Sequence, residues 1–288
     1  MARVLEHILL PLDLSEVSKP LAISVAELAS RHKSRVTLLH VIEEAMVIHV
    51  AAGYDVSSLI RSIEKNAREK LDKIRKLMME KGVNVVVYED IPVGNPGAVI
   101  SEVAEEVGAT EIVMGSKGLG IFRILPLGST VRETVKISRK PVIRLKTYKE
   151  NGHVKVAYSP RLFRKILVGV DRNTSKSMID YAVNAASTDD GKVVLAHIIE
   201  PPLEEPSYEV KNVFKYGEKA GEERGVEVEI VVARGRADKM LTAIASQMDA
   251  SSVLVGRTVE RRLSELILGS TLDRLMTLCE LPLIVYPL

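Results

Sequence analysis

Short apolar runs rich in Val, Ile and Leu recur along the chain and alternate with amphipathic segments. In the first half these runs are Ile8–Leu12, Val36–Val41, Val83–Tyr88, Ile112–Met114 and Val142–Leu145. Most of them are apolar at nearly every position, which is typical of strands that are buried on both faces of a parallel sheet.

The segments between these runs carry apolar residues at helical spacing. The three stripes are Leu21, Val25, Leu28 and Ala29; Ile60, Ile63, Ala67, Leu71, Ile74 and Met78; and Val99, Val103, Ala104 and Val107. This alternation predicts a doubly wound α/β fold with a five-stranded, mainly parallel sheet. Ligands of such sheets bind beyond the carboxyl ends of the strands, so we expect a site in the loops that follow Leu12, Val41 and Met114.

The second half repeats the first in the same order. ILLPLD at 8–13 matches ILVGVD at 166–171 at an offset of 158, and RVTLLHVIE at 35–43 matches KVVLAHIIE at 192–200 at an offset of 157. At an offset of 141, IVMGSKGLGIFRILPLGST at 112–130 matches VLVGRTVERRLSELILGST at 253–271, and KPVIRL at 140–145 matches LPLIVY at 281–286. The chain is therefore predicted to be a duplicated domain.

The fall in offset from 157 to 141 places 16 extra residues in the first copy, within about residues 44–93. We expect them in Ala45–Ser58 and in a long helix that follows. The counterpart in the second copy, roughly Pro201–Arg224, is shorter.

The domain boundaries follow from the repeat. We place the first domain at residues 1–147, a linker at 148–163 and the second domain at 164–288. Within the linker, Asn151-Gly152 is a turn signal and Val154–Tyr158 can form a short strand, which together predict a β-hairpin.

Composition excludes several classes of function. Forty Lys and Arg residues balance 38 Asp and Glu residues, so the net charge of +2 creates no strong field that attracts nucleic acid or a membrane surface. The absence of Trp argues against base-stacking platforms for single strands. Cys279 is the only cysteine, which excludes an intrachain disulfide and a Cys-rich zinc site. No apolar run approaches the roughly 18–20 residues of a membrane span. Ile8–Leu12 is stopped by Asp13 and lacks a signal-peptide cleavage site. We expect a cytoplasmic protein.

A glycine-rich loop follows the fourth predicted strand. It contains Gly115, Gly118 and Gly120 and ends at Gly128-Ser129-Thr130, where a helix is expected over 131–138. Bare backbone amides and a helix N-terminus together can cradle a phosphate. Alternatively, the glycines only form turns and the two hydroxyl residues only cap the helix. The spacing Thr130-x-x-Glu133, like Ser270-x-x-Asp273 in the second copy, is that of a capping box.

Other phosphate-binding motifs are missing from the sequence. There is no G-x4-G-K-[ST], and the turn after the first strand has no G-x-G-x-x-G. The chain is therefore predicted to be neither a P-loop NTPase nor an NAD-type dehydrogenase.

The spacing Gly115-x2-Gly118-x9-Gly128-Ser129 resembles the G-x2-G-x9-G-[ST] signature of the nucleotide-binding universal stress proteins. The segments Pro11-Leu12-Asp13 and LLHV at 38–41 are similar to that family too. The resemblance extends over both copies, as in a tandem of two UspA-like domains. It implies the Rossmann-like fold of the adenine nucleotide alpha-hydrolases and an internal pseudo-dimer.

In the family's ATP binders, the Asp after strand one contacts the ribose, the residue after the strand-two His holds adenine through its backbone, and the glycine signature binds the phosphates. The resemblance thereby implies a nucleotide-binding set of Pro11, Asp13, Val41, Met114, Gly115, Gly118, Gly128, Ser129 and Thr130, with Pro11 and Met114 included because they are adjacent to this site. Asp13 has an alternative role as an Asx-turn or N-cap residue. We interpret His40 and His197 as core histidines rather than catalytic ones.

The second copy departs from the signature, because Val259 stands where the first copy has Gly118. A β-branched residue resists positive φ and obstructs a phosphate. We therefore expect a weaker, altered or empty second site, made of Asp171, Ile198, Gly256, Gly269, Ser270 and Thr271. Arginines near this loop could bind phosphate through side chains or be solvated surface charges: Arg234, Arg236, Arg257, Arg261 and Arg262.

No catalytic set is evident in the sequence. Lys117 and Arg123 are candidate phosphate clamps, although cations in loops are usually solvated. The preferred hypothesis is an adenine-nucleotide-binding (ATP, ADP or AMP) stress-response or signalling module without strong catalysis, with Mg²⁺ or Mn²⁺ accompanying the phosphates. The alternatives are a slow ATPase or other adenine-nucleotide enzyme, and an interaction scaffold that binds no nucleotide. The resemblance also implies pairing of the last strands, Val142–Leu145 with Leu283–Tyr286, and allows a homodimer of tandem chains.

Overall fold

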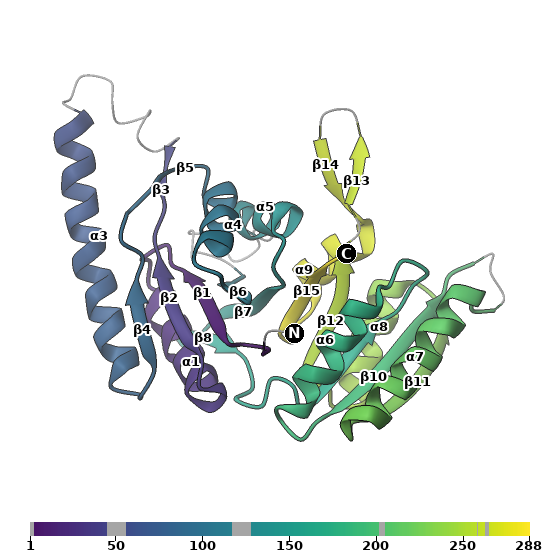
Figure 1. The fold of residues 1–288 in the computed structure, drawn as a ribbon. Coiled ribbons are helices and arrows are strands. Elements are labelled where there is room, and N and C mark those ends of the chain that lie inside the picture. The colour runs from purple at the N-terminus through teal and green to yellow at the C-terminus, as the bar shows by residue number, and fades with distance from the viewer. Residues whose placement is uncertain (1–2, 45–55, 117–127, 202–204, 258, 263–264) are drawn as a thin grey trace. The chain divides into compact units, whose positions relative to one another are not determined.

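The computed structural model describes residues 3–44, 56–116, 128–201, 205–257, 259–262 and 265–288 (Figure 1). The chain forms two compact units. Unit 1 comprises residues 1–142 and 146–156, and unit 2 comprises residues 143–145 and 157–288.

Unit 1 is built on a five-stranded sheet of order β7-β6-β1-β2-β4. The strands are β1 (His7–Pro11), β2 (Arg35–Leu39), β4 (Asn84–Val87), β6 (Glu111–Gly115) and β7 (Val142–Glu150). β1 pairs in parallel with β2 and β6, and β2 pairs in parallel with β4. Two short strands, β3 (Ile42–Glu43) and β5 (Val93–Gly94), continue the lines of β2 and β4 and pair with each other.

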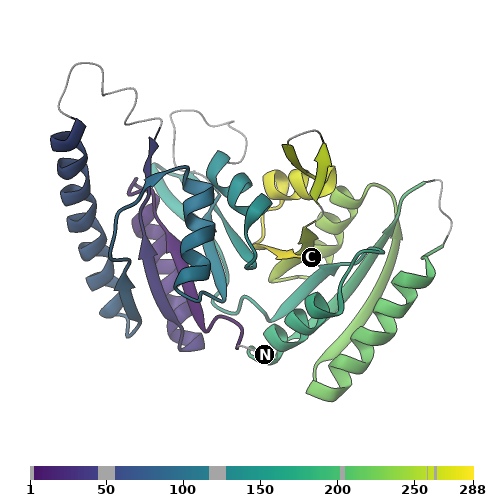
Figure 2. The same cartoon turned by 45° about the horizontal axis from the view of Figure 1, so that its top comes forward.

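Helices cover both faces of this sheet (Figures 1 and 2). α1 (Ser18–His32) packs beside α3 (Val56–Met79) on one face, and α4 (Pro96–Glu106) packs beside α5 (Ser129–Ile137) on the other. Buried side chains of β1, β2 and β6 fill the space between the layers. The predicted doubly wound fold is confirmed.

Unit 2 repeats this architecture with a sheet of order β11-β10-β9-β12-β15. The strands are β9 (Lys165–Gly169), β10 (Lys192–Ile199), β11 (Glu227–Arg234), β12 (Ser252–Arg257) and β15 (Leu283–Pro287). The helices are α6 (Lys176–Ser187), α7 (Tyr208–Arg224), α8 (Ala237–Gln247) and α9 (Ser270–Leu278). A small antiparallel hairpin, β13 (Val259–Arg262) and β14 (Glu265–Leu268), precedes α9.

Two local predictions can be compared with the structure. β7 and β8 (His153–Ala157) form the expected hairpin, and Asn151 and Gly152 between them have φ of 51° and 80°. This part of the linker prediction is confirmed. α3 has 24 residues against 17 in α7, so part of the extra length of the first copy lies in this helix, as predicted. Residues 45–55, where the rest was expected, lie outside the described residues.

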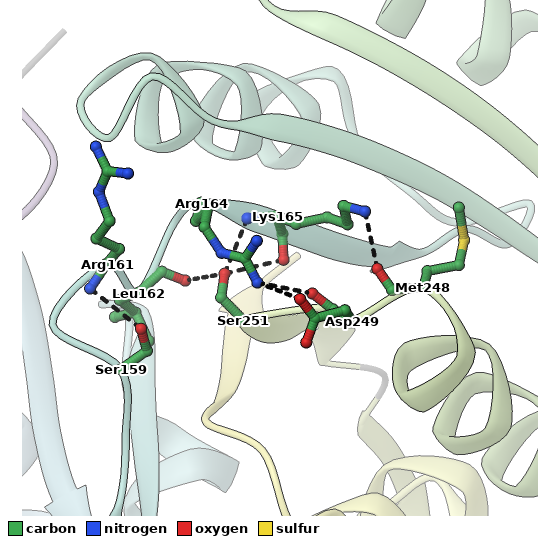
Figure 3. Close-up of polar contacts among 8 residues, drawn as sticks. All are labelled: Ser159, Arg161, Leu162, Arg164, Lys165, Met248, Asp249 and Ser251. Atoms are coloured by element: carbon green, nitrogen blue, oxygen red, sulfur yellow. Dashed lines mark hydrogen bonds and ion pairs between the residues drawn. The ribbon is translucent and has the colours of Figure 1, made fainter.

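The hydroxyl group of Ser251 joins neighbouring segments at the amino-terminal ends of the unit 2 strands (Figure 3). Ser251 Oγ accepts the Lys165 N–H at 2.9 Å and lies 2.9 Å from the Leu162 carbonyl oxygen. In unit 1, Thr110 Oγ1 accepts the His7 N–H at 3.0 Å in the same way. The duplicated sheets therefore share this device for fixing strand register.

No helix that the structure describes is both long and apolar enough to cross a membrane.

Candidate functional site

A cavity of about 420 Å³ lies at the carboxyl ends of the unit 1 strands. Eight of the nine predicted nucleotide-binding residues line it: Pro11, Asp13, Val41, Met114, Gly115, Gly128, Ser129 and Thr130. The ninth, Gly118, lies outside the described residues, as do Gly120, Lys117 and Arg123. Residues from three separate predicted loops thus meet at one cavity.

Val41 presents its backbone to this cavity. The Leu39 carbonyl accepts the Leu12 N–H (2.8 Å), whereas the Ile42 N–H donates to Pro92 on the other side (2.8 Å). Alternate residues of an extended chain point their amide groups in opposite directions, so Val41 points to the same side as Leu39, beyond the end of β1. Neither backbone group of Val41 has a hydrogen-bond partner among the described residues, which leaves one donor and one acceptor for a ligand.

Asp13 combines the two roles considered for it. Its Oδ1 accepts the Ser15 N–H (3.0 Å) and the Ser18 hydroxyl (2.9 Å), which is the predicted Asx turn. Its Oδ2 makes no hydrogen bond with the described residues. The turn therefore fixes the carboxylate while one oxygen remains as an acceptor at the cavity.

The N-terminus of α5 forms another wall. The predicted capping box is wrong, because the helix begins at Ser129 with Gly128 as its N-cap and no side chain caps it. Glu133 instead accepts a hydrogen bond from Asn95 Nδ2 at 3.2 Å. α9 likewise begins at Ser270, with Gly269 as its N-cap and no side chain that caps it. The capping box predicted for Ser270 and Asp273 is therefore also wrong. The first N–H groups of α5 thus have no capping side chain within the part of the chain that the structure describes, and they carry the positive end of the helix dipole.

His40 has a structural hydrogen bond. Its Nδ1 lies 2.7 Å from the Leu12 carbonyl oxygen, and in unit 2 the His197 Nδ1 lies 2.8 Å from the Val170 carbonyl oxygen. A carbonyl only accepts, so Nδ1 carries the proton in both rings. Burial lowers the pKa of His40. Each imidazole ties the end of one strand to its neighbour, in agreement with the interpretation as core histidines.

Several lining residues were not predicted from the sequence. They include Ile63 of α3, Glu43 of β3, and Pro96 and Ile100 of α4. Ile63 belongs to a recognised apolar stripe, but only the packing of α3 brings it to the cavity. The sequence did contain a signal for Glu43, because this residue lies in the repeated RVTLLHVIE segment two residues after Val41.

The second predicted set has different surroundings. Asp171 repeats the Asx turn, since its Oδ1 accepts the Asn173 N–H at 2.9 Å. Ile198 is buried within the continuous strand β10, and Ser270 and Thr271 begin α9 after Gly269. A Cβ added at Gly256 would lie 2.5 Å from Leu288 Cδ1, so the Leu288 side chain packs directly on this glycine.

The loop that replaces the glycine signature in unit 2 is paired with itself. The backbone of β13 pairs with that of β14, from Val259 opposite Leu268 to Arg262 opposite Glu265. Backbone groups used in a hairpin ladder cannot also cradle a phosphate. The backbone at Val259, the position of Gly118 in the repeat, is therefore paired within a hairpin.

The arginines of unit 2 have distinct roles. Arg236 is held by Asp238, with two nitrogen–oxygen distances of 2.7 Å. Arg257 is half-buried where the repeat places Ser116 in unit 1, and burial lowers its pKa. The side chains of Arg261 and Arg262 lie outside the described residues.

Comparison with known proteins identifies the family. The model of the universal stress protein family matches residues 5–146 and again residues 162–287. Universal stress protein MJ0577 of Methanocaldococcus jannaschii is 29% identical over 160 residues, which cover 51% of this chain and 98% of that protein. A universal stress protein of Mycolicibacterium smegmatis is 23% identical over 291 residues and 96% of each chain.

A solved structure supports the fold over the whole length. The crystal structure of a universal stress protein from Archaeoglobus fulgidus DSM 4304 matches with a TM-score of 0.75 at 23% identity, over 98% of each chain. Because the family model matches twice and covers nearly the whole sequence, the chain belongs to the universal stress protein family, as a tandem of two such domains.

Proposed function

We propose that unit 1 binds an adenine nucleotide and that the protein acts as a stress-response or signalling module without strong catalysis. The observation that carries this proposal is the convergence of the predicted residues on one cavity at the carboxyl edge of the sheet. The geometry provides a separate group for each part of a nucleotide.

The base faces the free N–H and C=O of Val41, which match an acceptor and a donor on the edge of adenine. The ribose hydroxyls donate to the free oxygen of Asp13. The phosphates accept hydrogen bonds from the first amides of α5 and from the hydroxyls of Ser129 and Thr130. Apolar side chains, among them Met114 and Ile100, cover the faces of the base.

A divalent cation would accompany a triphosphate. The described residues contain no group of three or more His, Cys, Asp or Glu side chains that could hold a metal ion. Mg²⁺ is commonly held by one or two carboxylates together with substrate phosphates, and this cavity would suit that mode through the phosphate oxygens.

We propose binding without strong catalysis because two of the three titratable side chains that line the described cavity, Asp13 and His40 but not Glu43, already have structural hydrogen bonds. Asp13 is committed through Oδ1 to its turn, and His40 is committed through Nδ1 to a carbonyl. Phosphoryl transfer requires a positioned nucleophile and charge clamps. Phosphate release from ATP above the buffer background would favour the slow-ATPase alternative.

Mass spectrometry of small molecules released from the purified, denatured protein tests the proposal directly. We expect an adenine nucleotide, and calorimetric titration with ATP, ADP and AMP should then rank the phosphate requirement. Purified protein that carries no nucleotide and binds none of the three would overturn the proposal in favour of the scaffold alternative.

The resemblance to the family also leads us to propose pairing between the two last strands and, at the next level, a homodimer of tandem chains. Light scattering coupled to size-exclusion chromatography distinguishes a 31.7 kDa monomer from a species of twice that mass.

A further inference from the structure

Glu43 and Glu200 occupy the same position of the repeat but have different contacts. Glu200 Oε1 accepts the N–H of Ala237, the first residue of α8, at 2.8 Å. The residue aligned with Ala237 at the offset of 141 is Pro96, the first residue of α4. Proline has no N–H, so Glu43 has no corresponding donor.

The N-terminus of α4 has no need of Glu43. Asn95 caps the helix by accepting the Ala98 N–H at 3.1 Å, and Pro96 is well suited to the first helical position. In unit 2 the N-cap residue is Arg236, whose side chain does not cap, and Glu200 serves instead. The same glutamate is therefore structural in one copy and released from that role in the other.

The released carboxylate lies at the cavity. Glu43 lines it together with Val41, and these residues share one side of the extended chain because they are two positions apart. The carboxylate of Glu43 makes no hydrogen bond or ion pair with any residue that the structure describes. Asp13 and Glu43 are the carboxylates of the described lining, and Asp13 stands at the end of β1 rather than β2.

We propose that Glu43 is a specificity-determining residue, whose carboxylate accepts one N–H of the exocyclic amino group of the bound base while the Val41 carbonyl accepts the other. This inference rests on the proposed function of unit 1. An ionised carboxylate only accepts hydrogen bonds, so it favours a base that offers an amino group over the same base without one. A charge-assisted bond of this kind is worth about a tenfold change in affinity.

The test compares AMP with purine riboside 5′-monophosphate, which differs from AMP only by lacking the amino group. Calorimetry of the full chain should show that Glu43→Ala lowers the affinity for AMP by about tenfold. The affinity for purine riboside 5′-monophosphate should change by less than twofold. The matched control, Glu200→Ala, should change neither affinity by more than twofold.

A second variant tests whether the missing N–H at Pro96 is what leaves the Glu43 carboxylate available. Pro96→Ala restores an N–H at the start of α4, where Glu43 can bind it as Glu200 binds Ala237. This variant should weaken AMP in the wild-type background and have no further effect in the Glu43→Ala background. A loss that is equal in both backgrounds would mean that Pro96 acts by contact with the ligand, which would contradict the proposed release of Glu43.

The outcomes separate the two proposals. Failure of the wild-type chain to bind either nucleotide overturns the proposed function together with this inference. Binding of both nucleotides with an equal loss in Glu43→Ala, or with none, overturns the role of Glu43 alone. Thermal unfolding of Glu43→Ala should stay close to that of the wild type, which confirms that its change in affinity is local, whereas Glu200→Ala also loses the hydrogen bond to the Ala237 N–H.

Discussion

The two units share one fold and differ where a ligand would bind. In unit 2, β10 and β11 are each eight residues long and stay paired along their whole length. In unit 1 the corresponding ladder is interrupted between β2 and β3 on one strand and between β4 and β5 on the other. The interruption lies beside the cavity, where the backbone groups of Val41 have no hydrogen-bond partner among the described residues.

This difference shows how a duplicated domain can keep its core and change its site. Strand register, the hydroxyl device at the amino-terminal ends and the histidine bonds are alike in both copies. The two copies differ in the loop that carries Gly118 or Val259, and in the first residue of α4 and α8, which is Pro96 in one copy and Ala237 in the other. A few substitutions at the carboxyl edge of the sheet are enough because the loops there contribute little to the core.

The largest expected effect concerns a polar network of unit 2 whose central carboxylate is replaced by an alanine in unit 1. Asp180 of α6, nearly buried, accepts hydrogen bonds from Tyr216 (2.8 Å) and Arg224 (3.1 Å) of α7, whereas the aligned residue in unit 1 is the buried Ala22. Asp180→Ala should lower the free energy of unfolding of unit 2 by about 2–3 kcal/mol, because two donors lose their acceptor. Unfolding in urea, followed by hydrogen exchange in peptides from unit 2, measures this loss of free energy. An unchanged midpoint would show that water replaces the carboxylate at no cost.

The next effect concerns nucleotide affinity. Asp13→Asn keeps an oxygen for the Asx turn but replaces the free oxygen by an amide NH₂, which cannot accept from a ribose hydroxyl. We expect AMP to bind about 10–100-fold more weakly, which corresponds to about 1.5–3 kcal/mol for a charge-assisted hydrogen bond.

Asp171→Asn is the matched control in unit 2 and should leave the affinity within twofold. If both variants weaken AMP equally, the two units bind the nucleotide alike and the contrast between them is wrong.

A smaller effect should be common to both units. Ser251→Ala removes the hydroxyl that joins Lys165 to Leu162 (Figure 3) and should cost unit 2 about 1–2 kcal/mol. Thr110→Val is the corresponding change in unit 1 and should have a similar cost. Chemical denaturation of both variants measures the pair. A large cost in only one unit would show that the shared device has lost its role in the other.

The smallest expected effect is a pH dependence of stability that arises from a histidine of unit 1. His7 Nδ1 accepts from Arg35 at 2.7 Å and Nε2 donates to Thr37 Oγ1 at 2.8 Å, so the ring is neutral. Burial, and then the Arg35 charge, lower the pKa of His7 below its usual 6.5. As the pH falls through 6.5 the unfolded chain takes up the proton first. The stability that this histidine provides at neutral pH is therefore lost progressively between 6.5 and the lowered pKa.

Lys165 stands at the aligned position in unit 2, which should show no such loss from this position. Hydrogen exchange of each unit at pH 7 and pH 5 measures the difference, and His7→Gln should reduce it. His40, whose pKa burial also lowers, contributes in the same direction. Equal weakening of both units on acidification would contradict the prediction.

Much of the fold was predictable because it depends on local pattern. Apolar runs without alternation indicated buried parallel strands, and the four matched segments revealed the duplication. Asn151-Gly152 indicated its hairpin because these residues tolerate positive φ. The capping boxes were wrong because spacing alone does not determine where a helix begins, and both helices begin directly after a glycine.

The sequence by itself determined the strand order along the chain and the repeat, and its resemblance to a known family indicated eight residues that line one cavity. Tertiary structure alone decided that the β2 line is interrupted after Leu39, that Ile63 of a distant helix reaches the cavity, and that Glu43 and Pro96 line the same cavity. The physical reason is that a local pattern fixes backbone conformation, whereas the partner of a carboxylate or an amide depends on which distant segment is packed against it.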